Sequence, residues 1–338
     1  MVELKYDSNQ SSKSIVIKVE ENKILTSIKP VIKLAEHVRI IEENIEAVCK
    51  DFNSRNVQYW MAASPFNLSD LNDKEKLNFI FVFNSINFCY WGKPKWTIEY
   101  EGNQYDGAWG MIGCLRRAID NKVPILQAKY LAKISEGELK EILKGNILIP
   151  LFEERLKILQ ENGKVLEEKY KGDFASIVEK AKKDTLNLLE IIISDFPSFN
   201  DVAFYKEYKV LFYKRVQLLI SDIYRTFEGE NYDKLKNIEL LTAFSDYKIP
   251  QVLRKLKILE YSPELASKID NQIPILSGSE EEIEIRANTI WAIEMMKEKI
   301  KPKIPNITSM DIDSYLWLLG QNKSSDDKPY HLTRTIFY

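Results

Sequence analysis

The feature that most constrains this fold is the helical spacing of the apolar residues, which continues through most of the chain. In residues 30–45 apolar side chains recur at three- and four-residue steps, which places them on one face of an α-helix. The same pattern predicts helices over residues 107–120, 203–228, 248–260 and 280–300. We therefore expect a mainly α-helical protein with little strand, folded as a single domain over residues 29–338.

Two other segments are less uniform. Residues 76–91 form an aromatic run that periodicity alone cannot assign to a helix or a strand, although sixteen residues favour a buried helix. Residues 134–193 predict several amphipathic helices, with breaks near Gly145, Gly163 and Gly172. Between them, residues 93–105 predict a loop with a short strand.

A small β element is expected near the N-terminus. Apolar and polar residues alternate over residues 13–19, which suggests a short hairpin or an appended arm. We therefore treat residues 1–28 as an N-terminal extension.

The charge balance and the small numbers of cysteines and histidines argue against several classes of protein. Lys and Arg number 48 against 50 Asp and Glu, a net charge of −2, whereas proteins that hold duplex nucleic acid usually carry a basic excess. Three cysteines and two histidines predict neither a disulfide framework nor a structural zinc site. No apolar stretch approaches the ~20 residues of a membrane span. The polar N-terminus lacks a signal peptide, so we expect a cytoplasmic protein.

Two adjacent cations, Lys214 and Arg215, stand among apolar residues of a predicted helix. The two side chains cannot both face solvent, so one of them could reach into a pocket and bind an anion inside the protein. Alternatively, the two side chains form a surface pair whose stems cover apolar residues.

The segment 241–251 mixes aromatic, acidic and turn-forming residues between two predicted helices. Such a loop suits the binding of a heterocyclic base, since Phe244 and Tyr247 can stack on it while Asp246 accepts its N–H donors. Alternatively, Asp246 caps the helix that begins near Pro250.

Two further acids, Asp311 and Asp313, precede an apolar run. Either they complement the dipole of a helix N-terminus, or one of them faces a cavity opposite a developing positive charge. The chain then ends on bulky apolar and aromatic residues, which predicts that this end packs into the core. That packing could also bring His331 and Arg334 to a site.

Signatures of cofactor and metal enzymes are missing from the sequence. It contains no Walker A loop, GxGxxG, GxSxG or HExxH motif. With no cofactor expected and few histidines for metal chemistry, hydrolysis driven by carboxylates is the simplest enzymatic reading.

These residues lie in stretches that resemble the queuosine salvage family, the queuosine 5′-phosphate N-glycosylases. The resemblance covers roughly residues 30–338 and is weakest over 120–195. Its main stretches are DVAFYKEYKVLFYKRVQLLISDIY (201–224), LTAFSDYKIPQVLRKLKILEYSPEL (241–265), EEIEIRANTIWAIE (281–294), DIDSYLW (311–317) and HLTRTIFY (331–338). The resemblance implies a helical fold similar to the helix-hairpin-helix DNA glycosylases. It also implies metal-free hydrolysis of queuosine 5′-phosphate to queuine and ribose 5-phosphate.

The resemblance also implies roles for particular residues. Asp313 would be the catalytic carboxylate, with Ser314 beside it, and Asp246 a second catalytic candidate. The base would be lined by Phe244, Asp246 and Tyr247. The other substrate-binding candidates, several of them cations suited to the phosphate, are Lys214, Arg215, Arg286, His331, Arg334 and His37. One departure is Leu318, which stands where many relatives carry an aspartate. The absence of that aspartate could weaken or shift base specificity.

Two other functions remain open at this stage. A nucleic-acid base glycosylase of related fold would need a basic face that grips the backbone, and the net charge argues against it. A non-catalytic binder of queuine or a nucleotide would make Asp246 and Asp313 ordinary capping residues. We expect a small-molecule substrate, no stable nucleic-acid partner and no membrane; the oligomeric state is not predicted.

Overall fold

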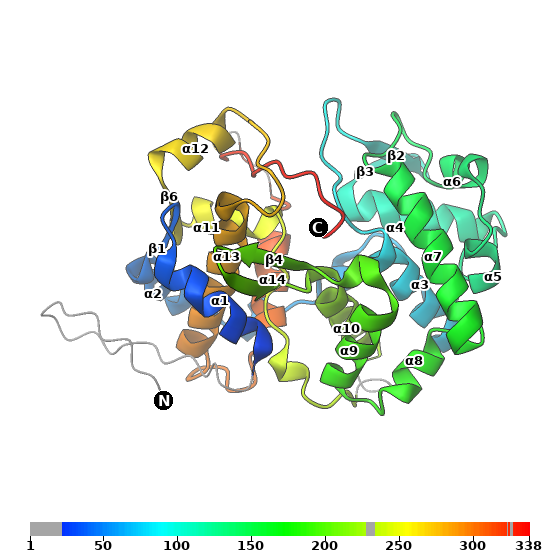
Figure 1. The fold of residues 1–338 in the computed structure, drawn as a ribbon, viewed down its shortest axis with the longest axis horizontal. Helices are drawn as coiled ribbons and strands as arrows, with labels where there is room; N and C mark the ends of the chain where they lie inside the picture. Colours follow the sequence, from blue (N-terminus) through cyan, green and yellow to red (C-terminus); the bar gives the residue numbers. More distant parts are fainter. Residues whose placement is uncertain (1–21, 228–233, 323, 325–326) are drawn as a thin grey trace, which may run out of the picture. The chain divides into compact units, whose positions relative to one another are not determined.

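The computed structural model describes residues 22–227, 234–322, 324 and 327–338 (Figure 1). The described residues form fourteen α-helices and three two-stranded antiparallel sheets, so the predicted mainly helical class is confirmed. The chain divides into two compact units, and the single domain predicted over residues 29–338 stays a prediction. The first comprises Met1–Trp60, Val202–Phe212 and Glu239–Thr333, and the second Met61–Asp201, Tyr213–Ile238 and Arg334–Tyr338.

The first unit is built around one buried helix, α13 (Glu280–Ile300). Three acids lie in its first turn, where they complement the helix dipole, and Ser279 accepts the N–H of Glu282 as N-cap. Residues 283–296 of this helix are all buried, so it is packed on every face. The other elements of the unit are α1 (Lys23–Leu34), β1 (Val38–Ile40), α2 (Glu42–Lys50), β4 (Val202–Tyr205), β5 (Tyr208–Leu211), α11 (Lys248–Lys255), β6 (Leu259–Tyr261), α12 (Pro263–Asp270) and α14 (Ser309–Leu319).

The predicted helix over residues 30–45 is wrong, because the chain breaks after α1. The buried carboxylate of Glu284 accepts the main-chain N–H groups of Glu36, His37 and Val38, at 2.6–3.1 Å. These donors therefore do not bond to carbonyls four residues back, and β1 pairs with β6 instead. The possible hairpin over 13–19 lies outside the described residues. Residues 23–28 belong to α1, so the boundary expected at residue 28 falls inside a helix.

Two other predicted helices are shorter than expected. Over 203–228 the helix begins only at Lys214, because β4 and β5 form a hairpin that pairs Val202 with Leu211 and turns at Lys206, a residue with φ of 53°. The helix over 248–260 ends at Lys255, and β6 follows.

The second unit is built around α3 (Asp73–Ser85), whose residues from Leu77 onward are all buried. It packs against α4 (Gly107–Asp120), α7 (Phe152–Tyr170), α8 (Ala175–Lys180) and α10 (Lys214–Thr226). The remaining elements are β2 (Thr97–Tyr100), β3 (Asn103–Asp106), α5 (Ala128–Leu131), α6 (Glu136–Ile142) and α9 (Thr185–Asp195). The helix predicted over 107–120 is confirmed with the same bounds, and β2 with β3 confirms a strand within 93–105.

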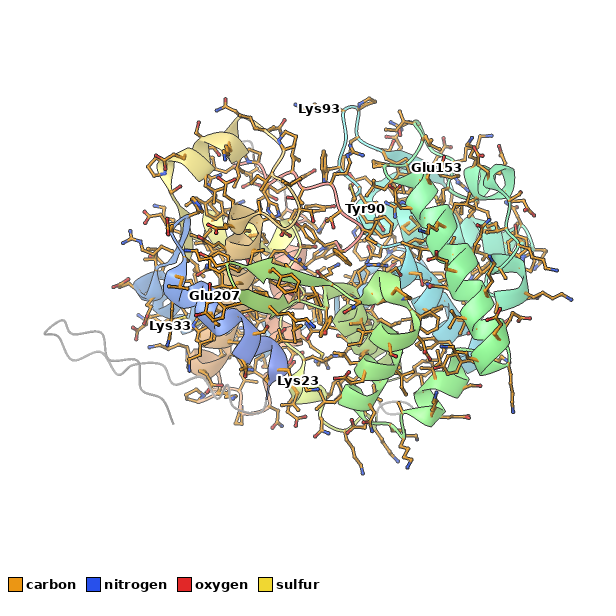
Figure 2. The ribbon with its side chains drawn as sticks, viewed as in Figure 1. Lys23, Lys33, Tyr90, Lys93, Glu153 and Glu207 are labelled. Carbon is orange, nitrogen blue, oxygen red and sulfur yellow. The ribbon has the colours of Figure 1, made fainter. Side chains whose placement is uncertain are left out.

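The predicted helix over 76–91 ends early, at Ser85, because two buried arginines bind the carbonyls of its last two residues and of the residues that follow. Arg215 donates to the carbonyls of Asn84 and Ser85, and Arg155 donates to those of Ile86, Phe88 and Cys89. The same segment carries Tyr90, which is labelled in Figure 2. Burial raises the pKa of Tyr90. Residues 86–91 are therefore held as irregular chain by side chains distant in the sequence.

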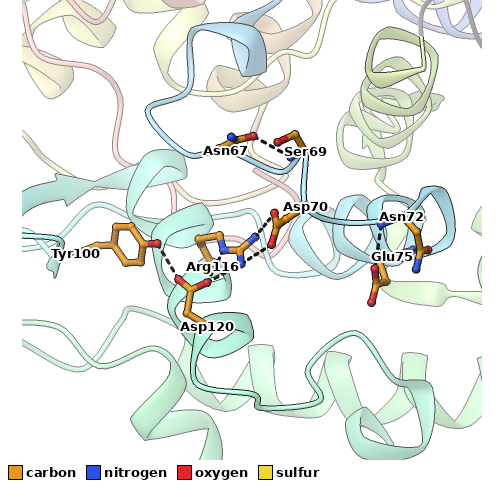
Figure 3. A network of polar contacts seen from close by, with 8 residues as sticks. All are labelled: Asn67, Ser69, Asp70, Asn72, Glu75, Tyr100, Arg116 and Asp120. Carbon is orange, nitrogen blue, oxygen red and sulfur yellow. Dashed lines mark hydrogen bonds and ion pairs between the residues drawn. The ribbon is translucent and has the colours of Figure 1, made fainter.

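A surface network joins the loop before α3 to α4 and β2 (Figure 3). The Arg116 guanidinium pairs with Asp70 at 2.8 Å and with Asp120 at 2.5 Å, and the hydroxyl of Tyr100 donates to Asp120. The hydrogen bonds from Arg116 hold the pKa of Asp120 below its usual range. All four residues have partners within the network, and we assign it a structural role.

The break predicted near Gly163 is wrong, since α7 runs through that residue. The breaks predicted near Gly145 and Gly172 are confirmed. A Cβ atom at Gly163 would lie 2.3 Å from the main-chain nitrogen of Ala132 and 2.8 Å from the carbonyl oxygen of Ala128. Glycine is thus required where α5 meets α7.

We expect Gly163→Ala to lower the free energy of unfolding by about 1–3 kcal/mol, because main-chain atoms of α5 would have to move. Chemical denaturation measures this. Gly137→Ala in α6 is the control, since a Cβ atom there meets nothing within 4 Å, and it should stabilise by about 0.4–1 kcal/mol. Equal stability of the two variants would contradict this account of Gly163.

Candidate functional site

The two acids of α14 have different roles in the structure. Thr308 is the N-cap, and Asp311 accepts its main-chain N–H and its hydroxyl at 2.9 and 2.7 Å in a capping box. The helix-terminus interpretation therefore holds for Asp311.

Asp313 reaches across to another segment of the first unit. Its carboxylate is 5% exposed, and Oδ2 accepts the main-chain N–H of Phe244 at 2.8 Å. The acid predicted to be catalytic is thus joined directly to the predicted base-binding segment 244–247. The structure brings together Asp313 and Phe244, which lie 69 positions apart in the sequence.

Asp246 caps α11, as one of the two interpretations requires. Its Oδ1 accepts the N–H groups of Lys248 and Ile249, at 2.6 and 3.0 Å. Within the described ranges, no hydrogen bond is made by Oδ2, so the cap occupies one carboxylate oxygen. Contact of Asp246 with a base remains a prediction. Tyr247 packs on Tyr330 with ring centroids 4.7 Å apart, an aromatic partner that the sequence did not single out.

Ser314 positions an aromatic cluster beside Asp313. Its hydroxyl accepts the main-chain N–H of Trp60 at 2.8 Å, and the Trp60 ring lies 5.2 Å from that of Trp317. A role of Ser314 in binding substrate stays a prediction. Trp60 was not predicted, and no pattern around it indicates its place, because the contact depends on a residue 254 positions away.

Arg286 is a buried cation in α13. Its guanidinium lies 3.9 Å from the ring centroid of Phe212 and 3.4 Å from the carboxylate of Glu282, and its Nε is 3.4 Å from the carbonyl oxygen of Ser245. The structure thus places Arg286 beside the segment 244–247.

His331 is also buried in the first unit. Burial, with a smaller contribution from the charge of Arg286, lowers the pKa of His331 to about 3. The imidazole is therefore neutral near pH 7. If it contacts the substrate, it does so as a neutral hydrogen-bonding group, and the cationic role for the phosphate falls to other residues.

This burial predicts a pH dependence of stability. Because the pKa of His331 in the folded protein lies below its unfolded value near 6.5, only the unfolded chain takes up the proton as the pH falls through 6.5 toward 3. The folded protein is therefore most stable, as far as His331 is concerned, above about pH 6.5. We expect the free energy of unfolding to fall by about 2 kcal/mol between pH 7 and pH 5. Urea titrations should show this slope in wild type and lose it in His331→Gln; parallel curves would contradict it.

His37 has a fixed main chain. Its N–H donates to Glu284 at 2.6 Å, and its carbonyl oxygen accepts the N–H of Ser262 at 2.8 Å. The imidazole is half-buried. Its contact with substrate stays a prediction.

Three predicted binding residues belong to the second unit, and their roles in a site also stay predictions. Lys214 and Arg215 are both buried, so the surface-pair interpretation is wrong. Arg215 donates to three main-chain carbonyls, which favours a structural role. Burial lowers the pKa of Arg215 to about 9. Arg334 is exposed and lies over the Trp91 ring at 4.9 Å.

The end of the chain is packed as predicted. Thr333 and Tyr338 are buried, and a main-chain oxygen of Tyr338 accepts the N–H of Cys89 at 2.8 Å.

In the described part of the chain, no group of three or more His, Cys, Asp or Glu side chains is arranged to hold a metal ion. No helix there is both long and apolar enough to span a membrane. The first unit does contain a buried carboxylate, Asp313, next to an aromatic and acidic segment. Such a carboxylate can stabilise a positive charge that develops on a bound molecule.

Comparisons with known proteins identify relatives along almost the whole chain. The family model described as queuosine salvage protein matches residues 67–338. A queuosine 5′-phosphate N-glycosylase/hydrolase of Sphaerobacter thermophilus is 39% identical over 316 residues, covering 93% of this chain and 97% of the relative. Proteins of the same name from Mus musculus and Nematostella vectensis are 33% and 35% identical, over 82% and 78% of this chain and 88% and 82% of the relatives.

Proposed function

The chain belongs to the queuosine salvage protein family, and we propose that it hydrolyses the N-glycosidic bond of queuosine 5′-phosphate, releasing queuine. The observation that carries this proposal is the hydrogen bond from the Phe244 N–H to Asp313, which joins a buried carboxylate to the aromatic and acidic segment 244–247. The relatives are named for the same reaction.

Asp313 would act on the sugar. Cleavage of an N-glycosidic bond builds oxocarbenium character on the ribose, and a buried carboxylate stabilises that charge or traps the sugar covalently. Asp313 suits this role because its surroundings exclude water and its hydrogen bond to Phe244 fixes its orientation.

The segment 244–247 would hold the leaving base. A 7-deazaguanine has no N7 to protonate, so hydrogen bonds at its remaining edge must share the negative charge that develops on departure. Asp246 can accept N–H donors of the base through Oδ2 while Oδ1 caps α11. The aromatic faces of Phe244 and Tyr247 supply stacking surfaces.

The substrate phosphate requires cations. Arg286 is the candidate within the first unit, because it is buried and lies beside the segment 244–247. We also infer a relationship of this helical architecture to the helix-hairpin-helix DNA glycosylases.

Incubation of the purified protein with queuosine 5′-phosphate tests the proposal. Mass-resolved chromatography should detect free queuine and ribose 5-phosphate in equal amounts, with guanosine 5′-phosphate as a control nucleotide. If no queuine is released while the nucleotide still raises the melting temperature, the chain is a binder and the proposal fails.

A further inference from the structure

Ser245 carries a buried hydroxyl that the fold does not use. The residue is 1% exposed, and no described residue makes a hydrogen bond with its Oγ. Two other buried hydroxyls of the first unit are paired: Thr289 donates to the carbonyl of Ile285, and Ser309 donates to Glu294. Leaving a hydroxyl buried without a partner costs roughly 1–3 kcal/mol, a cost that a ligand supplying a partner to Ser245 would remove.

The main chain around Ser245 is fixed on three sides. The N–H of Phe244 is bound to Asp313, the carboxylate of Asp246 caps α11, and the Ser245 carbonyl oxygen lies 3.4 Å from Nε of Arg286. Rotation about χ1 is thus the main freedom left to the Ser245 hydroxyl. A polar group held this way is arranged in advance for a ligand that supplies its partner.

We infer that the Ser245 hydroxyl hydrogen-bonds the base of the substrate and helps to determine base specificity, an inference that rests on the proposed function. Its neighbour Asp246 can only accept hydrogen bonds when ionised, whereas a hydroxyl can also donate. The two side chains are therefore complementary, with the carboxylate taking N–H donors of a 7-deazaguanine and the hydroxyl donating to an acceptor such as its carbonyl oxygen. A site with a buried polar group of this kind discriminates strongly against bases that leave it unpaired.

The inference predicts opposite effects of Ser245→Ala on stability and on function. Without ligand, the variant should melt at a higher temperature than wild type, because the unpaired hydroxyl is gone. Its kcat/KM for queuosine 5′-phosphate should fall about tenfold, mainly through KM, because one hydrogen bond to the bound base is lost. A hydroxyl with a purely structural role would not give this combination.

Ser198→Ala is the matched control. Ser198 also has a buried hydroxyl without a hydrogen-bond partner among the described residues, but it lies in the second unit and is assigned no role in the site. Its variant should gain stability in the same way and keep the kcat/KM of wild type.

Thermal shifts with the two product fragments locate the contact. In Ser245→Ala, the rise in melting temperature caused by queuine should shrink while the rise caused by ribose 5-phosphate is unchanged. Loss of the ribose 5-phosphate response alone would overturn the assignment to the base. An unchanged kcat/KM and unchanged queuine response in Ser245→Ala would overturn the inference. Failure of wild type to release queuine would instead overturn the proposed function, and the queuine shift would still test Ser245.

Discussion

Asp313→Asn should lower kcat for the release of queuine by about 10²–10³-fold while leaving the fold intact. Asparagine has the same shape, and its carbonyl oxygen can still accept the N–H of Phe244, so the segment 244–247 stays attached to α14. What is lost is the negative charge opposite the developing oxocarbenium ion. Initial rates of queuine release at saturating substrate measure kcat, and thermal melting checks the fold.

Asp311→Asn is the matched control for this prediction. It makes the same change two residues earlier on α14, at a carboxylate that serves the capping box of Thr308. It should cost about 0.5–1 kcal/mol of stability and leave kcat unchanged. If Asp313→Asn keeps the wild-type rate, the catalytic role moves to Asp246; if both variants lose activity equally, the loss reflects the helix end.

Helices whose signals are local could be predicted from the sequence. The bounds of α4 and α13 agree with the predicted ranges 107–120 and 280–300, because apolar periodicity and end signals lie within each segment. Where the chain departs from the prediction, the determining group lies far away in the sequence. Glu284 ends α1 from 246–248 positions away, and Arg155 holds the carbonyls that follow α3 from 66–69 positions away.

In the candidate site, too, local motifs could be predicted from the sequence, whereas contacts between distant residues could not. Similarity to a family indicated Asp313 and the segment 244–247, but the hydrogen bond between them joins residues 69 positions apart. Asp246 shows why a motif alone leaves alternatives open, since one carboxylate can cap a helix with one oxygen and retain the other. The neutral state of His331 and the unpaired hydroxyl of Ser245 depend on burial, which no local pattern of residues reports.

Glu284→Gln should lower the free energy of unfolding by about 3 kcal/mol, the largest loss of stability that we expect. Its carboxylate accepts the N–H groups of residues 36–38 and the hydroxyl of Tyr205, at 2.6–3.1 Å. A glutamine oxygen can still accept the three main-chain N–H groups, and its NH₂ group can donate to the Tyr205 hydroxyl, which also donates to the carbonyl of Leu34. What is lost is the negative charge, which weakens each of the three N–H hydrogen bonds by about 1 kcal/mol. Urea denaturation followed by circular dichroism measures the effect.

The position of Glu284 also connects this stability to the site. Glu280→Gln, an exposed acid on the same helix, is the control and should change stability by no more than about 0.5 kcal/mol. If His37 contacts the substrate, Glu284→Gln should raise KM more than it lowers kcat at a temperature where the variant stays folded, since His37 would be displaced while Asp313 would not. A stable Glu284→Gln variant would mean that the break after α1 is set by the pairing of β1 with β6 rather than by the buried carboxylate.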